Sequence, residues 1–276
     1  MVSNLRPTVK LRHLRNGFIE PLGGLVFPSH SRWATAGAPF GRLAALLLIV
    51  VVLEGMIASP ADAGSGSTCN DYNPALFTKG NTFKIVEKNV FVGGPPYTSV
   101  DESKVMGLAT FHGHKVIDVR HHIEIIYPGQ KTSDIIDEFN GISKPFVYDY
   151  GDRDHSSGAE VYSDPPISFP THYTVDVPYV SVSVDHTSSN GTDSTSTRHA
   201  TSTFLGMESV TVPAGTFMTC KIKDESYSGD TKSGFLYNWI VSSGRYAGIS
   251  IKSHAYSATG SSIGKVVALS LQLNGK

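Results

Sequence analysis

Two closely spaced histidines and the acids that follow them are the first residues that could do chemistry. His112 and His114 are separated by one residue, so on a β-strand both would project from the same face. Metal sites are built from such pairs, and Asp118, His122 and Glu124 follow in the next segment. However, His114 and His122 would lie about 26 Å apart along a strand, too far for one ion to contact both. The pattern favours a solvated polar face of a sheet. The alternative is a metal-dependent or other hydrolase that uses the His112/His114 region.

A second group is the acidic segment YDYGDRDHSSG, which contains Asp149, Asp152, Asp154 and His155. Alternating carboxylates can bind calcium through their oxygen atoms. The segment lacks the closing bidentate glutamate of a calcium loop, and Arg153 stands in its middle. We therefore predict a solvated turn here, and we assign no metal ligand in the chain.

The common catalytic and cofactor-binding motifs are missing from the sequence. There is no Gly-x-Ser-x-Gly, no phosphate-binding Gly-x-x-x-x-Gly-Lys, no dinucleotide fingerprint and no Cys-x-x-Cys. With 23 basic and 24 acidic residues, the chain also lacks the excess positive charge of a nucleic-acid-binding protein. The sequence therefore favours a non-enzymatic role, with no catalytic residue, no cofactor and no nucleic-acid partner.

An export signal is predicted near the N-terminus. The apolar run Leu43–Leu53 follows Arg42, and the small-residue pattern Ala61-Asp62-Ala63 suits signal-peptide cleavage. Eleven apolar residues are too few for a membrane span, which needs about 20. We predict an export signal with a long basic n-region over residues 1–63 and one mature domain over residues 64–276. The mature chain is expected to be periplasmic or extracellular. The alternative is an inner-membrane anchor formed by residues 43–58.

The predicted export signal affects how the net charge and the two cysteines are interpreted. Residues 64–276 hold 17 basic and 21 acidic residues, a net charge of −4, whereas the export segment carries +3. Cys69 and Cys220 could pair in an oxidising compartment. Alternatively, Cys69 lies in a flexible N-terminus and Cys220 is a buried strand residue.

The elements that must position these residues are predicted to be strands. Lys115–Tyr127 alternates apolar and polar residues strictly, which is typical of a half-buried strand. Only a short helical turn is expected, near Val100–Met106, and Ser188–Thr203 is expected to contain a long hairpin loop around Asn190-Gly191. The fold class is therefore all-β and mainly antiparallel: a curved sheet, a half-barrel or a sandwich. Further strands are expected at Thr82–Phe91, Val105–Phe111, Thr132–Phe139, Phe146–Tyr150, Tyr173–Asp185, Arg198–Leu205, Glu208–Val212, Thr216–Lys223, Phe235–Val241, Tyr246–His254 and Lys265–Leu273.

The segment VTVPAGTFMTC is predicted to be a tight hairpin. Pro213 cannot donate to a strand ladder, and Gly215 permits a left-handed turn, so the chain must reverse between them. Phe217 and Cys220 then lie on opposite faces of the return strand. Glu208, before the hairpin, is expected to be an exposed carboxylate at a strand end.

This hairpin also carries a resemblance. Phe204–Cys220, followed by Trp239 and by Gly248, Lys252 and Ser253, resembles a pattern in exported bacterial proteins of unknown function, Gly-x-Glu-x-Val-x-Val-Pro-Ala-Gly-Thr-Phe. The chain departs from that pattern after Trp239, where Ile-Val-Ser replaces Tyr-Ala-Pro. The resemblance implies a β-rich exported domain akin to the half-barrels of lipoprotein carriers, and it implies no activity.

Together these patterns predict an uncharacterised exported envelope protein that acts as a binding or structural module. The expected partner is a lipid, a peptide or an envelope protein, with membrane contact only through the export segment. The aromatic residues expected to line an apolar groove are Phe83, Phe217, Trp239 and Tyr246.

Overall fold

The computed structural model describes residues 68–70, 72–189, 191–228 and 231–275. The predicted export signal, its cleavage site and the alternative anchor at residues 43–58 lie outside the described residues. Within the described residues, no helix is long and apolar enough to cross a membrane.

The described chain is almost entirely antiparallel β-structure, which confirms the predicted fold class. Its long strands form a closed barrel, and two short strands pair separately. The barrel strands are β2 (Thr82–Phe91), β3 (Tyr97–Phe111), β4 (His114–Tyr127), β5 (Gln130–Ser143), β6 (Phe146–Asp154), β7 (Glu160–Pro170), β9 (Pro178–Ser189), β10 (Thr192–Val212), β11 (Gly215–Ser228), β12 (Thr231–Val241), β13 (Ser250–Ser257) and β14 (Ser262–Leu273). The separate pair is β1 (Thr68–Asn70) with β8 (His172–Thr174), and the 3₁₀ helix η2 spans Pro74–Phe77.

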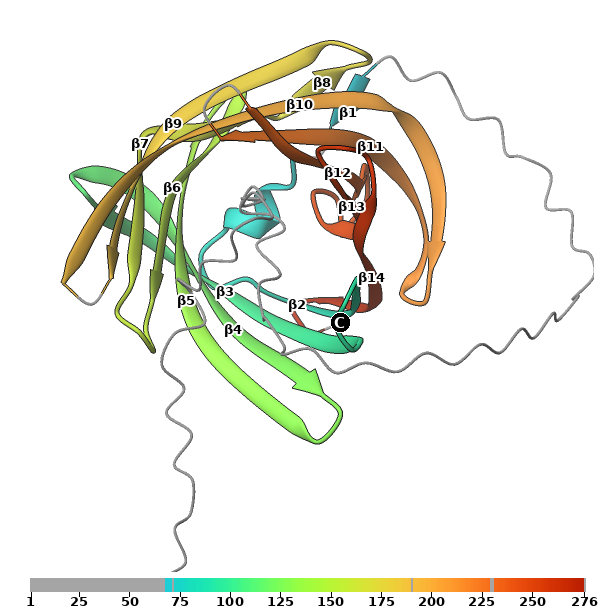
Figure 1. Ribbon diagram of the computed structural model, residues 1–276, viewed down its shortest axis with the longest axis horizontal. Helices are drawn as coiled ribbons and strands as arrows, with labels where there is room; N and C mark the ends of the chain where they lie inside the picture. Colours follow the sequence, from blue (N-terminus) through green and yellow to red (C-terminus); the bar gives the residue numbers. More distant parts are fainter. Residues whose placement is uncertain (1–67, 71, 190, 229–230, 276) are drawn as a thin grey trace, which may run out of the picture.

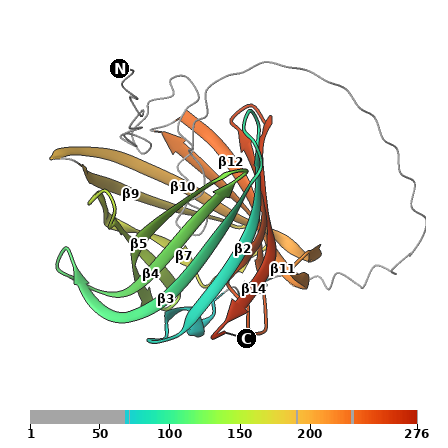
Figure 2. The same ribbon diagram turned by 90° about the horizontal axis from the view of Figure 1, so that it is seen from below.

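Most strands of the barrel pair with their neighbours in sequence, as in a meander. Two pairings depart from this order. β7 pairs with β9 around the short β8, and β14 pairs with β2, which joins a late strand to an early one. Figures 1 and 2 show the resulting ring of twisted strands. The predicted curved sheet thus closes on itself, because the β2–β14 and β9–β10 pairings leave no free edge.

Two sequence expectations about local structure are wrong. The stretch Val100–Met106 is strand, not a helical turn. Its residues alternate between more buried and more exposed positions, as do the residues before it in β3. The short helix is instead η2, where the Asn73 side chain accepts a hydrogen bond from the Ala75 amide and Pro74 occupies the first turn.

The Ser/Thr-rich segment is also strand rather than a long loop. Its residues pair from Thr192 opposite Ser189 to Thr203 opposite Pro178, so only two residues connect β9 to β10. Threonine is a good strand former because its β-branched side chain suits the pleated surface.

The VTVPAGTFMTC hairpin forms as predicted. Val212 pairs with Gly215, so Pro213 and Ala214 make the turn between β10 and β11. Phe217 packs against a core cluster that includes Val210 and Trp239, whereas Cys220 belongs to a different cluster with Phe204 and Ile222. The Phe217 and Cys220 side chains therefore lie on opposite faces of β11.

Side chains alternate between the two faces of the barrel wall, and the cross-strand register shows which face points into the lumen. On β3, every second residue from Tyr97 to Val105 is buried. Following the cross-strand pairs, this face continues from Val105 through Val119 to Glu138 on β5. Ile142 lies four residues further along the same face of β5, and its partner on β6 is Val147. Val147 lines a pocket together with residues of β11 and β12, which lie on the other side of the ring. We call this face of the wall the lumen face.

Cys69 and Cys220 form a disulfide that ties β1 to β11. Their Cα atoms are 5.9 Å apart, and both residues are fully buried beside Tyr173 of β8. The bridge therefore fixes the small β1–β8 sheet onto the barrel, and the segment that follows β1 leads into η2. In Figure 1 the cyan segment containing η2 lies inside the ring of strands.

Candidate functional site

A pocket opens between η2 and the lumen face at one end of the barrel. Its walls come from β6 and β7 and from β11 and β12, which β9 and β10 separate in the ring, and η2 supplies the remaining side. The apolar lining residues are Leu76, Phe77, Val147, Phe169, Ile222 and Ile240, and the polar ones include Asn73, Asp224 and Asn238. The cavity is small, about 50 Å³, which leaves room for only a few water-sized groups while η2 is in place.

Side-chain amides hold η2 in this position. Asn73 donates from Nδ2 to the carbonyl oxygen of Arg245 at 3.1 Å, which ties the start of η2 to the loop between β12 and β13. Asn81 donates from Nδ2 to the carbonyl oxygen of Ala75 at 2.9 Å. The backbone of Asn81 also accepts from Val105 on β3. The loop between β12 and β13, through Asn73, and strand β3, through Asn81, thus fix the helix that closes the pocket.

The polar groups of the pocket are themselves connected. Asn238 donates from Nδ2 to Asp224 Oδ2 at 2.9 Å, and Ser202 donates to Asp224 Oδ1 at 2.6 Å. These contacts fix the orientation of the Asp224 carboxylate at the edge of an otherwise apolar wall. An apolar pocket with a few oriented polar groups is the usual form of a small-molecule site.

The four aromatic residues predicted to line a groove do not line this pocket. Phe217 and Tyr246 pack against the core cluster that contains Trp239, with the rings of Phe217 and Tyr246 6.2 Å apart and edge to face. Phe83 lies elsewhere, with its ring 6.2 Å from that of His121. Three of the four residues are therefore brought together, but as part of a packed core.

Glu208 has a specific partner that the sequence did not reveal. Its Oε2 accepts a hydrogen bond from Trp239 Nε1 at 3.0 Å and lies 3.5 Å from Lys221 Nζ. Lys252 covers the Trp239 ring with its ammonium 4.1 Å from the ring centroid. The glutamate and the tryptophan of the sequence motif thus form a direct contact between β10 and β12, which gives the motif a structural role.

His112 and His114 lie at the hairpin between β3 and β4, and each contacts β7. His112 Nε2 is 2.6 Å from Glu160 Oε1, and His114 Nε2 is 3.1 Å from the Tyr162 hydroxyl. Arg153 also pairs with Glu160, and these contacts hold the pKa of Glu160 below its usual value against the effect of burial. The neighbours of the two histidines are thus a glutamate, an arginine and a tyrosine.

The other residues of the predicted histidine group lie apart from this contact. His122 and Glu124 are on β4 toward its far end, and Glu124 pairs with Lys131 at 2.5 Å. Asp118 is partly buried, and burial raises its pKa, with the charge of Asp137 adding to the effect. Among the residues that the structure describes, no three histidine, cysteine or acidic side chains are placed to hold a metal ion.

The acidic segment is strand, so the predicted solvated turn is wrong for most of it. Asp149, Asp152 and Asp154 lie on β6 and are all nearly fully buried. By the register, Asp152 pairs with Glu138 and Asp154 with Ile136 on the lumen face. The sequence does not show this strand because its alternation is interrupted at Gly151, where β6 has an irregular register and a positive φ of 129°.

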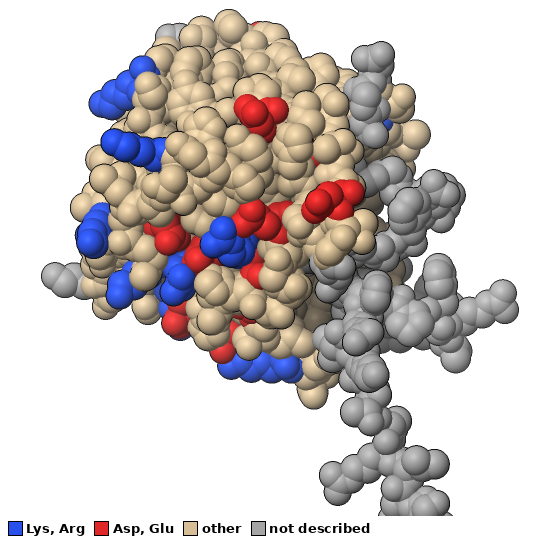
Figure 3. All heavy atoms as spheres, turned by 90° about the vertical axis from the view of Figure 1, so that its left-hand side faces the viewer, with Lys and Arg blue, Asp and Glu red and all other residues tan. Residues whose placement is uncertain are grey.

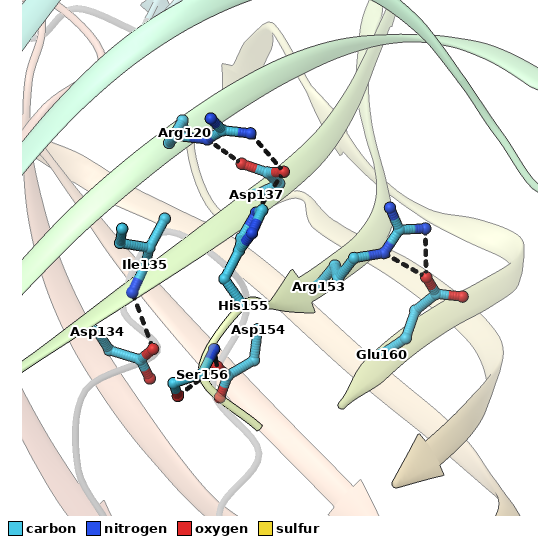
Figure 4. Close-up of polar contacts among 9 residues, drawn as sticks. All are labelled: Arg120, Asp134, Ile135, Asp137, Arg153, Asp154, His155, Ser156 and Glu160. Atoms are coloured by element: carbon cyan, nitrogen blue, oxygen red, sulfur yellow. Dashed lines mark hydrogen bonds and ion pairs between the residues drawn. The ribbon is translucent and has the colours of Figure 1, made fainter. Parts of the chain in front are cut away.

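The turn begins only at Asp154. Asp154 accepts hydrogen bonds from Ser156, and His155 Nε2 lies 2.7 Å from Asp137 Oδ2 (Figure 4). Arg120 binds the same Asp137 carboxylate through two nitrogen atoms at 2.7 and 3.0 Å. Figure 3 shows this side of the molecule, where acidic and basic side chains are interspersed on the surface. Such mixed ion pairs are typical of a structural surface network.

The lumen face carries a second polar group, centred on His121. Its Nδ1 lies 3.0 Å from Asp101 Oδ2 and 2.9 Å from Ser103 Oγ, and its Nε2 lies 3.4 Å from Glu138 Oε2. Burial alone would lower the pKa of His121, but the carboxylates of Asp101 and Glu138 raise it to about 10. His121 is therefore an imidazolium near neutral pH, which suits an ion pair and not a general base.

Glu87 stands beside this group on β2. Ser99 donates to Glu87 Oε2 at 3.4 Å, and Asn89 donates from Nδ2 to Ser99 Oγ at 2.9 Å. Burial and the nearby charge of Asp101 raise the pKa of Glu87 to about 7, although the Ser99 hydrogen bond opposes the shift. Neither His121 nor Glu87 was singled out from the sequence. The only available signal was the presence of charged residues at apolar-face positions of predicted strands.

The comparisons with known proteins give no family. No family model matches the chain, and no curated protein matches it. Two solved structures are similar: a proposed lipoprotein from Parabacteroides distasonis, at 16% identity and a TM-score of 0.41, and a proposed exported protein with a YmcC-like fold from Bacteroides fragilis, at 12% identity and a TM-score of 0.40. Each match covers 71% of this chain and 96% of the other.

Proposed function

We propose that the protein is an exported, non-enzymatic binding module of the cell envelope that holds the apolar end of a lipid acyl chain in the pocket beside η2. The observation that carries this proposal is the pocket itself, a mainly apolar cavity whose walls come from non-neighbouring strands of one closed barrel. The aliphatic and aromatic side chains suit an acyl chain. Asp224 and Asn238 mark a polar edge where the rest of the lipid would leave the pocket.

The size of the cavity makes η2 part of the proposed mechanism. A space of about 50 Å³ accepts only the end of a chain, so a longer segment needs η2 to move away from the lumen face. Side chains of η2 that face the pocket, such as Leu76 and Phe77, would then be replaced by the ligand. The apolar surface buried by the helix in the empty protein is the same surface that an acyl chain would bury.

Export is supported by residues on both sides of the predicted cleavage site. The basic flank, the apolar run Leu43–Leu53 and the small-residue pattern that follows are the parts of a secretory signal peptide. The Cys69–Cys220 disulfide is the kind of bond that persists in an oxidising compartment such as the periplasm. Mass spectrometry of the protein recovered from a periplasmic fraction should find an N-terminus at Gly64. An intact N-terminus in the membrane fraction would favour the anchored form.

Lipid binding is tested with a fluorescent long-chain fatty acid and two changes of one residue. Leu76→Trp should fill the pocket and weaken binding of the probe at least tenfold, whereas Leu76→Ala should enlarge it and strengthen binding. The control is Leu108→Trp, because Leu108 is 86% exposed on β3 and lies outside the pocket. Equal affinities in all three variants would overturn the proposal, as would an organic extract of the purified protein without lipid combined with no probe binding. Peptide or protein recovery in place of lipid would also count against it.

A further inference from the structure

The outer face of the barrel wall carries a group of lysines between β11 and β2. Ile222 on β11 and Asn238 on β12 line the pocket, so the residues that alternate with them face out of the ring. In Figure 1, β13 and β14 lie on the right of the ring, across from β5 and β6 on its left. We call this part of the outer wall the lysine face, and its lysines are Lys88, Lys221, Lys223, Lys252 and Lys265.

Cross-strand pairing arranges the lysine face in two parallel rows. The first row runs from β11 to β2 in the order Lys221, Trp239, Lys252, Val267 and Lys88. The second row runs along the same strands in the order Lys223, Tyr237, His254, Lys265 and Val90. Neighbouring strands lie about 4.8 Å apart, so each row spans about 19 Å. Aromatic or aliphatic side chains thus stand between the lysines of both rows.

The aromatic rings hold lysine side chains against the wall. The ammonium group of Lys252 lies 4.1 Å from the centroid of the Trp239 ring, and that of Lys221 lies 5.4 Å from the centroid of the Tyr237 ring. A lysine over a ring buries its aliphatic stem and keeps its charged end near water. Because an ammonium group has three donors, it can still donate hydrogen bonds to an anionic group outside the wall.

The acidic neighbours of the lysine face do not neutralise its charge. Glu208 pairs with Lys221, and Glu225 pairs with Lys223 and with the nearby Lys232. Three members of the face have no acidic side chain within ion-pair distance among the residues that the structure describes: Lys88, Lys252 and Lys265. The lysine face is therefore positively charged.

This positive charge is localised, because the mature chain as a whole is acidic. Residues 64–276 carry a net charge of −4. Within the lysine face, burial lowers the pKa of His254, and the charges of Lys265 and Lys252 lower it further. A region of one sign on a chain of the other sign attracts an anionic partner and orients it.

We propose that the lysine face docks the protein onto the surface of an anionic phospholipid membrane. Headgroup phosphates accept hydrogen bonds from ammonium groups, and each lysine near an anionic leaflet adds about fivefold to the affinity. Tyrosine and tryptophan rings favour the boundary between headgroups and acyl chains, and Val90, which is 44% exposed, offers apolar contact there.

The arrangement of the lysines favours a membrane over a single charged polymer. The two rows cover five strands in two dimensions, which suits a surface of many headgroups better than one chain of charges. The sequence predicted membrane contact only through the export segment, so this contact would be a second one. It does not depend on the proposed acyl-chain pocket, because the lysines face outward.

The test is flotation of the protein recovered from the periplasmic fraction with two kinds of vesicle. One kind is phosphatidylcholine alone, and the other is equal parts phosphatidylcholine and phosphatidylglycerol. We expect binding only to the anionic vesicles at about 0.1 M salt, and release at about 1 M salt, where the screening length falls to about 3 Å.

Variants locate the contact on the lysine face. Lys252→Gln/Lys265→Gln should lower the partition coefficient about 25-fold, and Glu225→Gln should raise it about fivefold because it removes an opposing charge. The matched control is Lys104→Gln/Lys115→Gln, which removes the same charge from two exposed residues of β3 and β4 outside the two rows. Its partition coefficient should change less than twofold.

Several results would overturn the inference. Equal binding of the unaltered protein to both kinds of vesicle would do so, and that measurement does not require any variant to fold. Equal losses in the two double variants would show general charge attraction. Binding to soluble dextran sulfate without binding to anionic vesicles would show a site for a charged polymer. The pocket variant Leu76→Trp should still float with anionic vesicles, so either proposal can fail alone.

Discussion

The Cys69–Cys220 disulfide should contribute a large part of the stability of the fold. The bridge closes a loop of 151 residues that contains most of the barrel, from η2 to the middle of β11. Without it, the unfolded chain gains the conformational freedom of that loop. The proposed change is the double variant Cys69→Ala/Cys220→Ala, which keeps both positions apolar within their core cluster.

The magnitude follows from the length of the loop. In the chain-entropy model, closing a loop of this length removes about 17 cal/mol/K from the unfolded ensemble, or about 5 kcal/mol at 25 °C. For a domain of this size, each kcal/mol shifts the melting temperature by roughly 2–4 °C. The double variant should therefore melt about 10–20 °C lower than the unaltered protein. Because typical domains have only about 5–15 kcal/mol of stability, much of the variant would be unfolded near 37 °C.

The assay is urea unfolding followed by tryptophan fluorescence, with thiols counted under denaturing conditions to confirm the bridge in the unaltered protein. The unfolded variant exposes more surface, so its slope m should rise and extrapolated free energies must be compared, not midpoints. A difference below about 1 kcal/mol would refute the reasoning. If β1 alone detached, the global free energy would stay the same while trypsin cut faster at Lys79.

Four substitutions test charged groups of the barrel wall. Glu87→Gln should stabilise the protein at pH 8 by up to about 3 kcal/mol. The raised pKa of Glu87 means that stability is lost as pH rises from about 4.5 to 7, so the urea midpoint of the variant should stay flat across that range. His121→Gln should lose a dependence of the same sign at higher pH: the ion pair stabilises fully below pH 6.5 and is lost as pH rises towards 10, which midpoints at pH 6 and 10 would show. Arg198→Ala should cost about 3–5 kcal/mol, because it removes one partner of a buried ion pair whose other member, Asp185, lies 3.1 Å away. Lys84→Ala, which breaks an exposed pair, should cost less than about 1 kcal/mol by the same urea assay.

The strands were predictable wherever one face is apolar. Thr82–Phe91 has the same bounds in the sequence prediction and in the structure, and Lys115–Tyr127 differs from β4 by one residue. In both, apolar and polar side chains alternate because one face packs and the other contacts water. The Ser/Thr-rich half of β10 was missed because both of its faces are polar, so alternation carries no signal there.

The candidate site was harder to predict because it depends on closure. Val147 and Ile222 line one pocket although they lie far apart in sequence and on strands that are not neighbours in the ring. No local pattern in the sequence shows that β7 pairs with β9 or that β14 pairs with β2. Glu87 and Asp101 are charged residues at positions that an open sheet would expose to water. These positions become buried only when the sheet closes into a barrel, and that burial raises the pKa of Glu87.

The hydrogen bond between Glu208 and Trp239 could not be predicted from the sequence for a different reason. Both residues belong to the sequence motif, but 31 positions separate them, and the motif does not show which strands pair. The hairpin at Pro213 could be predicted because its turn chemistry is local. The hydrogen bond between its first strand and β12 could not, because it spans the intervening β11.

The seam between β2 and β14 has a consequence for how the chain reaches its native state. Phe83 pairs with Leu273, so the ring cannot close until about 190 residues have been ordered between them. Until then, the free side of β2 presents unpaired amide and carbonyl groups to any other strand within reach. Such long-range pairing slows folding and prolongs the aggregation-prone interval. The β2 edge is therefore the part of the fold that stays open longest when the chain folds from its N-terminal side.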